Sequence, residues 1–468
     1  MVFRRDLRLA DNPALAAACA AHHSIVPVYI HASDENDPWP PGAASRWWLY
    51  HSLQSLQGAL RNVQGNLHLR VGVTLQVLWE LIEQSGAETV YWNRLYEPAS
   101  IARDTEVKTA LEGKGIAVQT RNSALWSEPW EITTQEGAPY RVFTAYWRKL
   151  RPRLDSVPQL AETCSPRWRE LPNGLPLEAL KLLPSIRWDG GLAETWQPGE
   201  RGATDMLKVF CDGALESYSL ARDFPARHGT SRLSPHLHFG EISPQRIHLA
   251  LMDHARRLDA KRRPDIEPYL RELGWREFAH HLLYHFPSTP TQNFNSRFDA
   301  FRWQPADELV LARWQQGRTG IPLVDAGMRE MWHTGWMHNR VRMVVASFLT
   351  KNLLQHWSHG ADWFWDTLVD ADLANNTLGW QWVAGSGADA APYFRVFNPV
   401  TQAKKFDPEG SYLRRWLPEL SGFPLDRLHE PWLDPALLAH SGYPAPMVDL
   451  AQSRVSALAA YQELTSSR

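Results

Sequence analysis

The stretch from Asp370 to Arg395, DADLANNTLGWQWVAGSGADAAPYFR, gathers side chains that could hold a flat, polar ligand. Its first half brings together neighbouring carboxylates, neighbouring amides and two indoles, on Asp370, Asp372, Asn375, Asn376, Trp380 and Trp382, and the stretch ends on the guanidinium of Arg395. Buried polar groups are costly unless each finds a partner, so paired acids and amides beside an apolar face favour a bound ligand. The structural alternative is a helix capped by Asp372 and followed by tryptophans of the core.

The segment LRELGWREF places Glu272, Trp275 and Arg276 close together on one helix face. A carboxylate beside an aromatic ring and a guanidinium suits the recognition of a flat heteroaromatic ring that carries N–H groups. The alternative is an i,i+4 ion pair between Glu272 and Arg276, which requires no ligand.

A third cluster lies in GWMHNRVRMVVASFL and contains Trp336, Asn339, Arg340, Arg342 and Met343. Because Asn339 and Arg342 are three residues apart, they can face one ligand together. Arg340 then points elsewhere and could meet a phosphate. Packing in the core is the commoner use of a methionine such as Met343.

A fourth cluster, HGTSRLSPHLHFGEIS, places Thr230, Ser231 and Ser234 just before a helical run, with Tyr218 shortly upstream. Hydroxyls and free backbone N–H groups at the start of a helix form a natural phosphate site. A simple serine N-cap is the alternative.

The first of the elements that must position these clusters is an α/β domain, predicted over residues 1–125. Short β-rich runs alternate there with amphipathic runs, which is typical of a doubly wound, mainly parallel sheet. We expect a short first strand, further strands at 24–31, 66–72, 88–96 and 116–122, and helices at 9–21, 45–63, 73–86 and 104–115. Since GxGxxG follows none of these strands, the domain need not hold a dinucleotide in the usual way.

The remainder of the chain is predicted to be a connector and a helical domain. Residues 126–200 are punctuated by proline and tryptophan, which favours a long interdomain connector. Residues 201–468 have helical spacing throughout and predict a large all-α domain. Its expected helices include 203–220, 243–258, 268–286, 323–335, 337–357 and 450–464.

The chain length of 468 residues agrees with a protein of two domains. The formal net charge of -2 provides no global basic field, although a local basic patch could still bind nucleic acid. The 23 tryptophans suggest stacking surfaces or a redox relay, with core packing as the alternative.

The sequence also gives expectations about where the protein is located and whether it binds a metal. The first residues, MVFRRDLRLADNPAL, place arginines where a secretory signal needs an apolar run, and no window approaches a membrane span. We therefore expect a cytoplasmic protein without a membrane segment. The HLH at 236–238 and the HH at 280–281 lack a partnered ligand set, so we expect no metal site.

Taken together and in this order, the motifs resemble those of the photolyase/cryptochrome flavoproteins. The resemblance covers nearly the full chain and is carried by FRRDLRLADNPAL, RDFPARHGTSRLSPHLHFGEIS, LRELGWREF, GRTGIPLVDAGMREMWHTGWMHNRVRM, DADLANNTLGWQWVAGSGADAAPYFRVFNP and KFDPEGSYLRRWLPEL. It implies an α/β domain associated with an antenna chromophore and a helical domain that binds FAD.

The resemblance also implies which residues bind the cofactors. For FAD these would be Tyr218, Thr230, Ser231, Leu233, Arg276, Trp336, Asn339, Arg342, Asp370, Asp372 and Asn376. Asn376 matches the position that faces flavin N5. The identity of the antenna chromophore stays open, because Ala99 and Ser100 stand where many folate-binding relatives have an Asn-Glu pair. Methenyltetrahydrofolate ranks ahead of a deazaflavin or an empty site.

The reaction implied by the resemblance is light-driven cleavage of cyclobutane pyrimidine dimers in DNA, in which excited reduced FAD donates an electron and then recovers it. The dimer must leave the duplex to reach the flavin. Glu272 would hydrogen-bond the dimer and stabilise its radical anion, and Trp275 and Trp382 would flank its bases. Phosphate contacts would come from Arg340, Arg395 and, less securely, Lys404 or Lys405.

Three tryptophans match the family's electron relay from the surface to the flavin. They are Trp380, Trp357 and Trp303. Core packing would be the default interpretation of each.

The branch of the family is set by a few positions. Met343 matches the cyclobutane-dimer enzymes, and little sequence follows the expected helix at 450–464, whereas plant cryptochromes carry a long tail. Leu378 in its LGWQ context is instead similar to plant cryptochromes, although these typically place Asp at the position of Asn376. We therefore expect a monomeric repair lyase that binds DNA containing pyrimidine dimers. A cryptochrome-like blue-light photoreceptor with little or no repair activity is the alternative.

Overall fold

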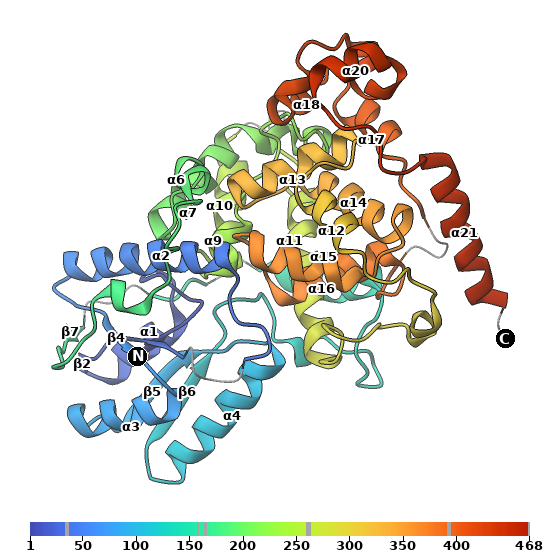
Figure 1. Ribbon diagram of the computed structural model, residues 1–468. Coiled ribbons are helices and arrows are strands. Elements are labelled where there is room, and N and C mark those ends of the chain that lie inside the picture. The colour runs from blue at the N-terminus through green and yellow to red at the C-terminus, as the bar shows by residue number, and fades with distance from the viewer. Residues whose placement is uncertain (33–36, 157–158, 163–165, 259–263, 391–394, 467–468) are drawn as a thin grey trace. The chain divides into compact units, whose positions relative to one another are not determined.

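The computed structural model describes residues 1–32, 37–156, 159–162, 166–258, 264–390 and 395–466 (Figure 1). The chain divides into two compact units. The first unit combines residues 1–216 with 231–287, and the second combines residues 217–230 with 288–468. The domain boundaries expected from sequence remain a prediction.

The first unit contains a five-stranded parallel sheet in the order β4-β3-β1-β5-β6. Its strands are β1 (Val2–Phe3), β3 (Val28–His31), β4 (His68–Val71), β5 (Thr89–Asn93) and β6 (Ala117–Arg121). The helices between them are α1 (Pro13–Ala21), α2 (Ala43–Asn62), α3 (Thr74–Ser85) and α4 (Pro98–Glu112). The predicted doubly wound α/β fold is confirmed, and the short first strand is the central one.

Packing explains why the strands and helices of this sheet form where they do. Leu78 of α3 and Val107 and Leu111 of α4 pack with Val90 and Val118 of the strands in one apolar cluster. Burying such side chains is the main stabilising contribution to a sheet covered by helices. A separate parallel pair joins β2 (Ser24–Ile25) to β7 (Arg167–Trp168).

The crevice at the carboxyl ends of β1 and β5 is filled by the chain's own side chains. In open α/β sheets this point, where the strand order reverses, is the usual nucleotide site. Here the Asn93 amide at the end of β5 donates to Asp6 Oδ2 at 2.5 Å and to Asn12 Oδ1 at 2.8 Å. All three side chains are buried. These side chains therefore satisfy one another in a polar network at this edge, and the absence of a dinucleotide there remains a prediction.

The segment 126–200 contains more structure than a connector. It includes η1 (Pro129–Glu131), α5 (Phe143–Leu150), η2 (Arg151–Leu154), η3 (Leu177–Leu180) and α6 (Gly190–Thr195). The buried residues of α5 are Phe143, Tyr146, Trp147 and Leu150, which form one stripe at helical spacing. The predicted connector thus contains helical elements that its proline and tryptophan content did not indicate, and its role as a connector remains a prediction.

The remaining helices of the first unit are α7 (Glu200–Asp212), α9 (Ser234–His238), α10 (Pro244–Arg257) and α11 (Glu267–His285). α5 packs against α11, and Gly274 of α11 leaves room for the Trp147 ring. A Cβ at this position would lie 2.4 Å from that ring, so the glycine permits the close approach of the two helices.

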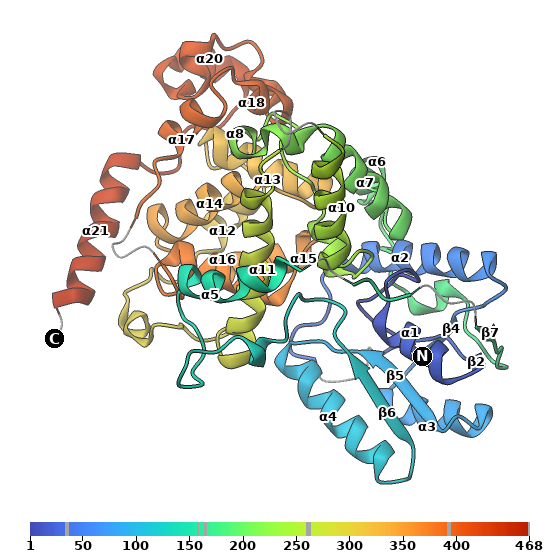
Figure 2. The ribbon, with the colours of Figure 1, turned by 180° about the vertical axis from the view of Figure 1, so that it is seen from behind.

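The second unit is helical, as predicted for the C-terminal part of the chain (Figure 2). Its elements are α8 (Tyr218–Ala221), η5 (Ser296–Ala300), α12 (Glu308–Gln315), α13 (Pro322–Thr334), α14 (Asn339–Ser347), η6 (Phe348–Asn352), α15 (Trp357–Thr367), α16 (Leu373–Ala384), α17 (Pro399–Phe406), α18 (Ser411–Trp416), η7 (Pro418–Leu420), α19 (Leu425–Leu428), η8 (Pro431–Leu433), α20 (Pro435–Ser441) and α21 (Leu450–Ser466). One large core cluster joins α12 to α18. Among the described residues, the helices are too short or too polar to cross a bilayer.

One predicted helix, 337–357, is interrupted. α14 ends at Ser347 and continues as the π-helical segment η6. Leu354 then adopts a left-handed conformation, with φ of 51°, before α15 starts at Trp357. A left-handed residue cannot continue a right-handed α-helix, and π-helical turns are frequent near functional sites.

Candidate functional site

The N-termini of α14 and α16 form the polar centre of the second unit. The two loops that lead into these helices are tied together, because Val369 N–H donates to the Gly335 carbonyl at 2.8 Å. Across them, Arg342 Nη2 lies 3.0 and 2.9 Å from the two carboxylate oxygens of Asp370. Arg342 Nε also donates to the Met337 carbonyl at 2.7 Å. The Asp370 carboxylate is buried and shielded from water, whereas the Arg342 side chain is partly exposed.

Asp372 is the N-cap of α16, as the structural alternative expected. Its Oδ1 accepts the backbone N–H of Asn375 at 2.9 Å and the side-chain amide of Asn375 at 2.7 Å. One turn further in, the Asn376 amide donates to the Ala361 carbonyl at 3.0 Å. Within the described part of the chain, Asn376 Oδ1 meets no hydrogen-bond donor. That oxygen can therefore accept a hydrogen bond from a ligand.

The start of α14 is organised by His338, whose Nδ1 accepts the backbone N–H of Arg340 at 3.2 Å. Burial lowers the pKa of His338 to about 4, so its ring is neutral at physiological pH. The Trp336 ring packs edge-on against His338, with 6.1 Å between their centroids. Asn339 is the first residue of the helix and lies beside this pair.

Arg340 and Arg342 diverge, as their spacing predicted. Arg340 Nη2 pairs with Asp223 at 2.8 Å, and its guanidinium lies 4.5 Å from the Phe406 ring centroid. Its Nη1 is 3.9 Å from the Met343 sulfur. The proposed phosphate contact of Arg340 remains a prediction, and Asp223 would have to share the guanidinium with the phosphate.

The three predicted relay tryptophans lie on neighbouring elements of the second unit. The rings of Trp303 and His356 are 5.4 Å apart, and those of His356 and Trp357 are 5.3 Å apart. Trp380 of α16 packs on Gly360 of α15, one turn after Trp357, where a Cβ would lie 2.0 Å from the indole. The π-contact between Trp303 and Trp357 thus passes through a histidine that sequence reasoning missed.

The remaining DNA-contact candidates of the second unit lie around η6 and α17. Trp382 is half-buried against the large core, and Arg395 is exposed. The Lys351 amine donates to the Arg395 carbonyl. Burial and the nearby Arg395 charge lower the pKa of Lys351 to about 7. Lys404 pairs with Glu430, so its charge is already partly compensated.

The predicted phosphate-binding segment is divided between the two units. Tyr218 and Thr230 belong to the second unit, with Tyr218 buried. In the first unit, Ser231 Oγ accepts the Tyr269 hydroxyl at 2.8 Å and the Leu233 N–H at 3.4 Å. Ser234 begins α9, which is a single short helix. That both groups of residues bind one ligand remains a prediction.

The face of α11 predicted to meet substrate carries Glu272 and Trp275, both half-buried. The Trp275 ring stacks on Phe143 with 3.7 Å between centroids and 10° between planes. The Arg271 guanidinium lies 4.9 Å from the Phe143 centroid. Phe143 is fully buried and makes a rigid backing for the indole.

Arg276 does not form the ion pair that sequence spacing suggested as an alternative. Its Nη1 donates to the Ala124 carbonyl at 2.7 Å, and its charged partner is Glu277, at 3.8 Å, rather than Glu272. Burial raises the pKa of Glu277 to about 7. Arg276 therefore braces the loop at Ala124, and its predicted contact with a cofactor remains untested.

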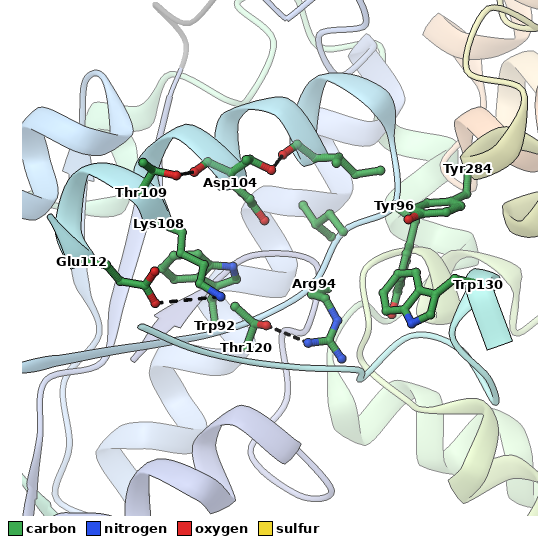
Figure 3. A pocket seen from close by; sticks show the side chains of 13 residues that line it. Trp92, Arg94, Tyr96, Asp104, Lys108, Thr109, Glu112, Thr120, Trp130 and Tyr284 are labelled. Carbon is green, nitrogen blue, oxygen red and sulfur yellow. Dashed lines mark hydrogen bonds and ion pairs between the residues drawn. The ribbon is translucent and has the colours of Figure 1, made fainter. Parts of the chain in front are cut away.

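A pocket of about 370 Å³ lies in the first unit between α4 and the ends of β5 and β6 (Figure 3). Its lining is Trp92, Arg94, Leu95, Tyr96, Ile101, Asp104, Thr105, Lys108, Thr109, Glu112, Thr120, Trp130 and Tyr284. Arg94 is held by Glu128 and by Thr120 Oγ1, the latter at 2.7 Å, and lies over the Trp130 ring. The pocket thus combines aromatic walls with the cationic groups of Arg94 and Lys108.

Sequence reasoning missed several residues that the structure places beside the candidates. Phe143 had a signal, the helical spacing within FTAYWRKL, but the surrounding prolines concealed it. No sequence signal could have identified Asp223, Asn293 or His356. Their contacts are with residues distant in the chain or depend on a turn.

Comparisons with known proteins agree with this arrangement. Residues 1–166 match the family described as DNA photolyase, and residues 269–463 match the FAD binding domain of DNA photolyase. A deoxyribodipyrimidine photo-lyase of Agrobacterium fabrum is 45% identical over 98% of this chain and 96% of its own. Cryptochrome-2 of Arabidopsis thaliana is 40% identical over 97% of this chain and 76% of its own.

Structural similarity supports the same assignment. The crystal structure of a bacterial class III photolyase from Agrobacterium tumefaciens superposes with a TM-score of 0.93 at 44% identity, covering 100% of this chain and 97% of that one. The chain belongs to the photolyase/cryptochrome family.

Proposed function

We propose that this protein is a deoxyribodipyrimidine photo-lyase that uses blue light to split cyclobutane pyrimidine dimers in DNA. The observation that carries the proposal is that α11 places the Glu272 carboxylate three residues before Trp275, whose indole stacks on Phe143. Supporting it, a relative that is 45% identical over almost its whole length carries this activity in its name.

The donor set of the second unit fits an FAD cofactor. The Arg342–Asp370 pair, the buried Asp372 carboxylate and the Asn376 Oδ1 oxygen offer donors and acceptors to the polar edges of a flat heterocycle. When bound and reduced, FAD supplies the light-excited electron for the reaction. The chain's residues bind and orient the cofactor and substrate, and Asn376 offers its amide at the position proposed to face flavin N5.

In this proposal Glu272 hydrogen-bonds the base edges of a flipped dimer and stabilises the negative charge that develops on it. Trp275 stacks on the dimer, and base stacking contributes about 1–3 kcal/mol per base. Trp382 flanks the other base. Arg340 and Arg395 hold backbone phosphates around the damage, and Met343 is a further candidate for a contact with the substrate.

The relay of Trp380, Trp357 and Trp303 is proposed to return oxidised protein to its active form. Their neighbouring positions and the ring of His356 between the outer two support this role. Electrons enter at Trp303, which is half-exposed, and move inward to Trp380.

The antenna proposal is methenyltetrahydrofolate, ahead of a deazaflavin or no antenna. The usual nucleotide crevice is filled by Asp6, Asn12 and Asn93, which disfavours a nucleotide-like chromophore at that point. The pocket beside α4 offers Trp130 for stacking, and Lys108, which now pairs with Glu112 at 3.9 Å, would have to exchange that partner for an anionic tail. An absorbance band beyond that of FAD, released on denaturation and identified by mass, tests the assignment.

A blue-light photoreceptor with little repair is the second candidate, favoured by Leu378 and by the 40% identity to a cryptochrome. Leu378 lies half-buried on α16, two residues after Asn376. Such a receptor would accumulate a light-stabilised flavin radical and change its association on illumination. We expect instead a monomer in both light and dark, which size-exclusion chromatography under each condition tests. We also expect the protein to be cytoplasmic.

The deciding experiment is repair of a thymine dimer in a defined oligonucleotide by dithionite-reduced protein whose FAD content is known. We expect loss of the dimer in the lit sample and none in the dark. If the lit sample keeps its dimers while FAD is bound and reduced, the lyase proposal fails. Leu378→Gly then tests whether that side chain prevents repair.

A further inference from the structure

The indole N–H groups of Trp357 and Trp303 have different surroundings. The Trp357 N–H donates to Asn293 Oδ1 at 3.0 Å. The Trp303 Nε1 atom is buried and, among the described residues, has no hydrogen-bond partner. The two outer members of the proposed relay are therefore chemically inequivalent, although their rings are linked through His356.

The amide of Asn293 is held in one orientation. Its Nδ2 donates to Asp299 Oδ1 at 2.8 Å, while its Oδ1 accepts from the indole. An indole N–H can only donate and a carboxylate can only accept, so the amide cannot reverse without losing both bonds. The exposed Asp299, on η5, thus fixes an oxygen against Trp357 in the interior.

The consequence concerns the charge that Trp357 would carry. When an indole gives up an electron it becomes a cation, and its N–H becomes a stronger donor. A preorganised carbonyl oxygen aimed at that N–H stabilises the cation without any rearrangement. A neutral amide is a very weak base, so the proton remains on the indole nitrogen throughout.

We propose that Asn293, oriented by Asp299, is a positioning residue that eases removal of an electron from Trp357; this rests on the proposed relay. Once the light-excited oxidised cofactor has taken an electron from Trp380, one electron would pass from Trp357 to Trp380 and one from Trp303 to Trp357. A thiol in solution then gives one electron to Trp303, releases its proton to the solvent and becomes a thiyl radical. Trp357 ends unchanged, with one electron lost and one gained.

The test compares wild-type holoprotein with Asn293→Leu and with the matched control Gln292→Leu. Gln292 is the exposed preceding residue, so its replacement changes the loop in the same way without touching the indole. Indole N–H resonances of protein carrying 15N-labelled tryptophan, assigned with Trp357→Phe, report the hydrogen bond in the dark. Light-driven reduction in the presence of a thiol reports the relay.

We expect Asn293→Leu to shift the Trp357 resonance and slow photoreduction on the order of fivefold, the effect of losing one hydrogen bond. Asn293→Gln should restore part of the rate, and Gln292→Leu should change neither readout. The inference is overturned if the resonance does not move, or if it moves while photoreduction keeps its wild-type rate.

A separate measurement distinguishes this inference from the proposed function. Protein reduced with dithionite needs no relay, so Asn293→Leu should repair dimers at the wild-type rate in that assay. If wild type photoreduces normally but repairs nothing, the lyase proposal fails while the assignment of Asn293 stands. If Asn293→Leu repairs slowly even when chemically reduced, the residue acts outside the relay and the inference is wrong.

Discussion

Arg342 Nη2 lies within 3.0 Å of both carboxylate oxygens of the buried Asp370, and this pair joins α14 to the loop before α16. We expect Arg342→Met to leave Asp370 as an uncompensated buried charge and to lower the free energy of unfolding by about 3 kcal/mol. Urea denaturation measures this change. The double variant with Asp370→Asn should recover most of the stability, because the uncompensated charge is gone.

FAD retention separates the structural role of this pair from its role in binding. If the two side chains also contact the cofactor, the double variant should stay depleted of FAD although its stability is recovered. Full FAD content in the double variant would contradict the proposed binding role of Arg342 and Asp370.

Glu272 permits a test of chemistry without loss of cofactor. We expect Glu272→Gln to keep FAD bound and to slow repair by dithionite-reduced protein about 10- to 100-fold, since hydrogen bonds to charged groups contribute about 1.5–3 kcal/mol. Glu106→Gln is the control, because Glu106 is an exposed glutamate on α4, and this variant should repair normally. Loss of FAD from Glu272→Gln would show that our assignment of this residue to the substrate is wrong.

Trp357→Phe should block light-driven reduction of oxidised protein while leaving repair by chemically reduced protein intact. Phenylalanine fills much of the same volume but is far harder to oxidise, so packing on His356 is largely kept. Absorbance of oxidised FAD during illumination follows the reduction. Unimpaired photoreduction would mean that the electron reaches the cofactor by another route.

The sequence predicted the elements of the α/β unit well because their signals are local. β5 and β6 follow from alternating β-rich runs, and α3 from an amphipathic stripe that ends at Gly86, whose φ of 63° suits glycine. The break at η6 was missed because apolar residues at helical spacing run across it, namely Val344, Val345, Phe348, Leu349 and Leu353. Its cause, the left-handed Leu354, has no local signal.

Site residues could be predicted from the sequence where the chemistry requires a particular residue type. Their contacts could not be predicted where the two partners are far apart in the chain. Arg342 and Asp370 were both identified, but their mutual pairing was not, since 28 residues separate them. For Arg340 the residue was identified from the sequence, but its charged partner was missed. Its partner Asp223 is 117 residues away, and no local pattern connects the two positions.

Glu277 provides a prediction about pH, because burial raises its pKa from the usual 4.5 to about 7. Its Oε2 accepts the backbone N–H groups of Trp126 and Ser127, at 2.9 and 3.3 Å. Between pH 4.5 and 7 the folded protein binds this proton more tightly than the unfolded chain does. The contribution of Glu277 to stability therefore falls as pH rises, by up to about 1.4 kcal/mol per pH unit.

Glu277→Gln should remove that decline while keeping an oxygen to accept the same two N–H groups. The measurement is the free energy of unfolding from urea titrations at several pH values between 4.5 and 7, for wild type, Glu277→Gln and the exposed control Glu106→Gln. We expect the difference between Glu277→Gln and wild type to grow in favour of the variant as pH rises, and the Glu106→Gln control to run parallel to wild type. A constant difference across this range would mean that Glu277 does not titrate there, and that Arg276 and the two backbone donors hold it ionised.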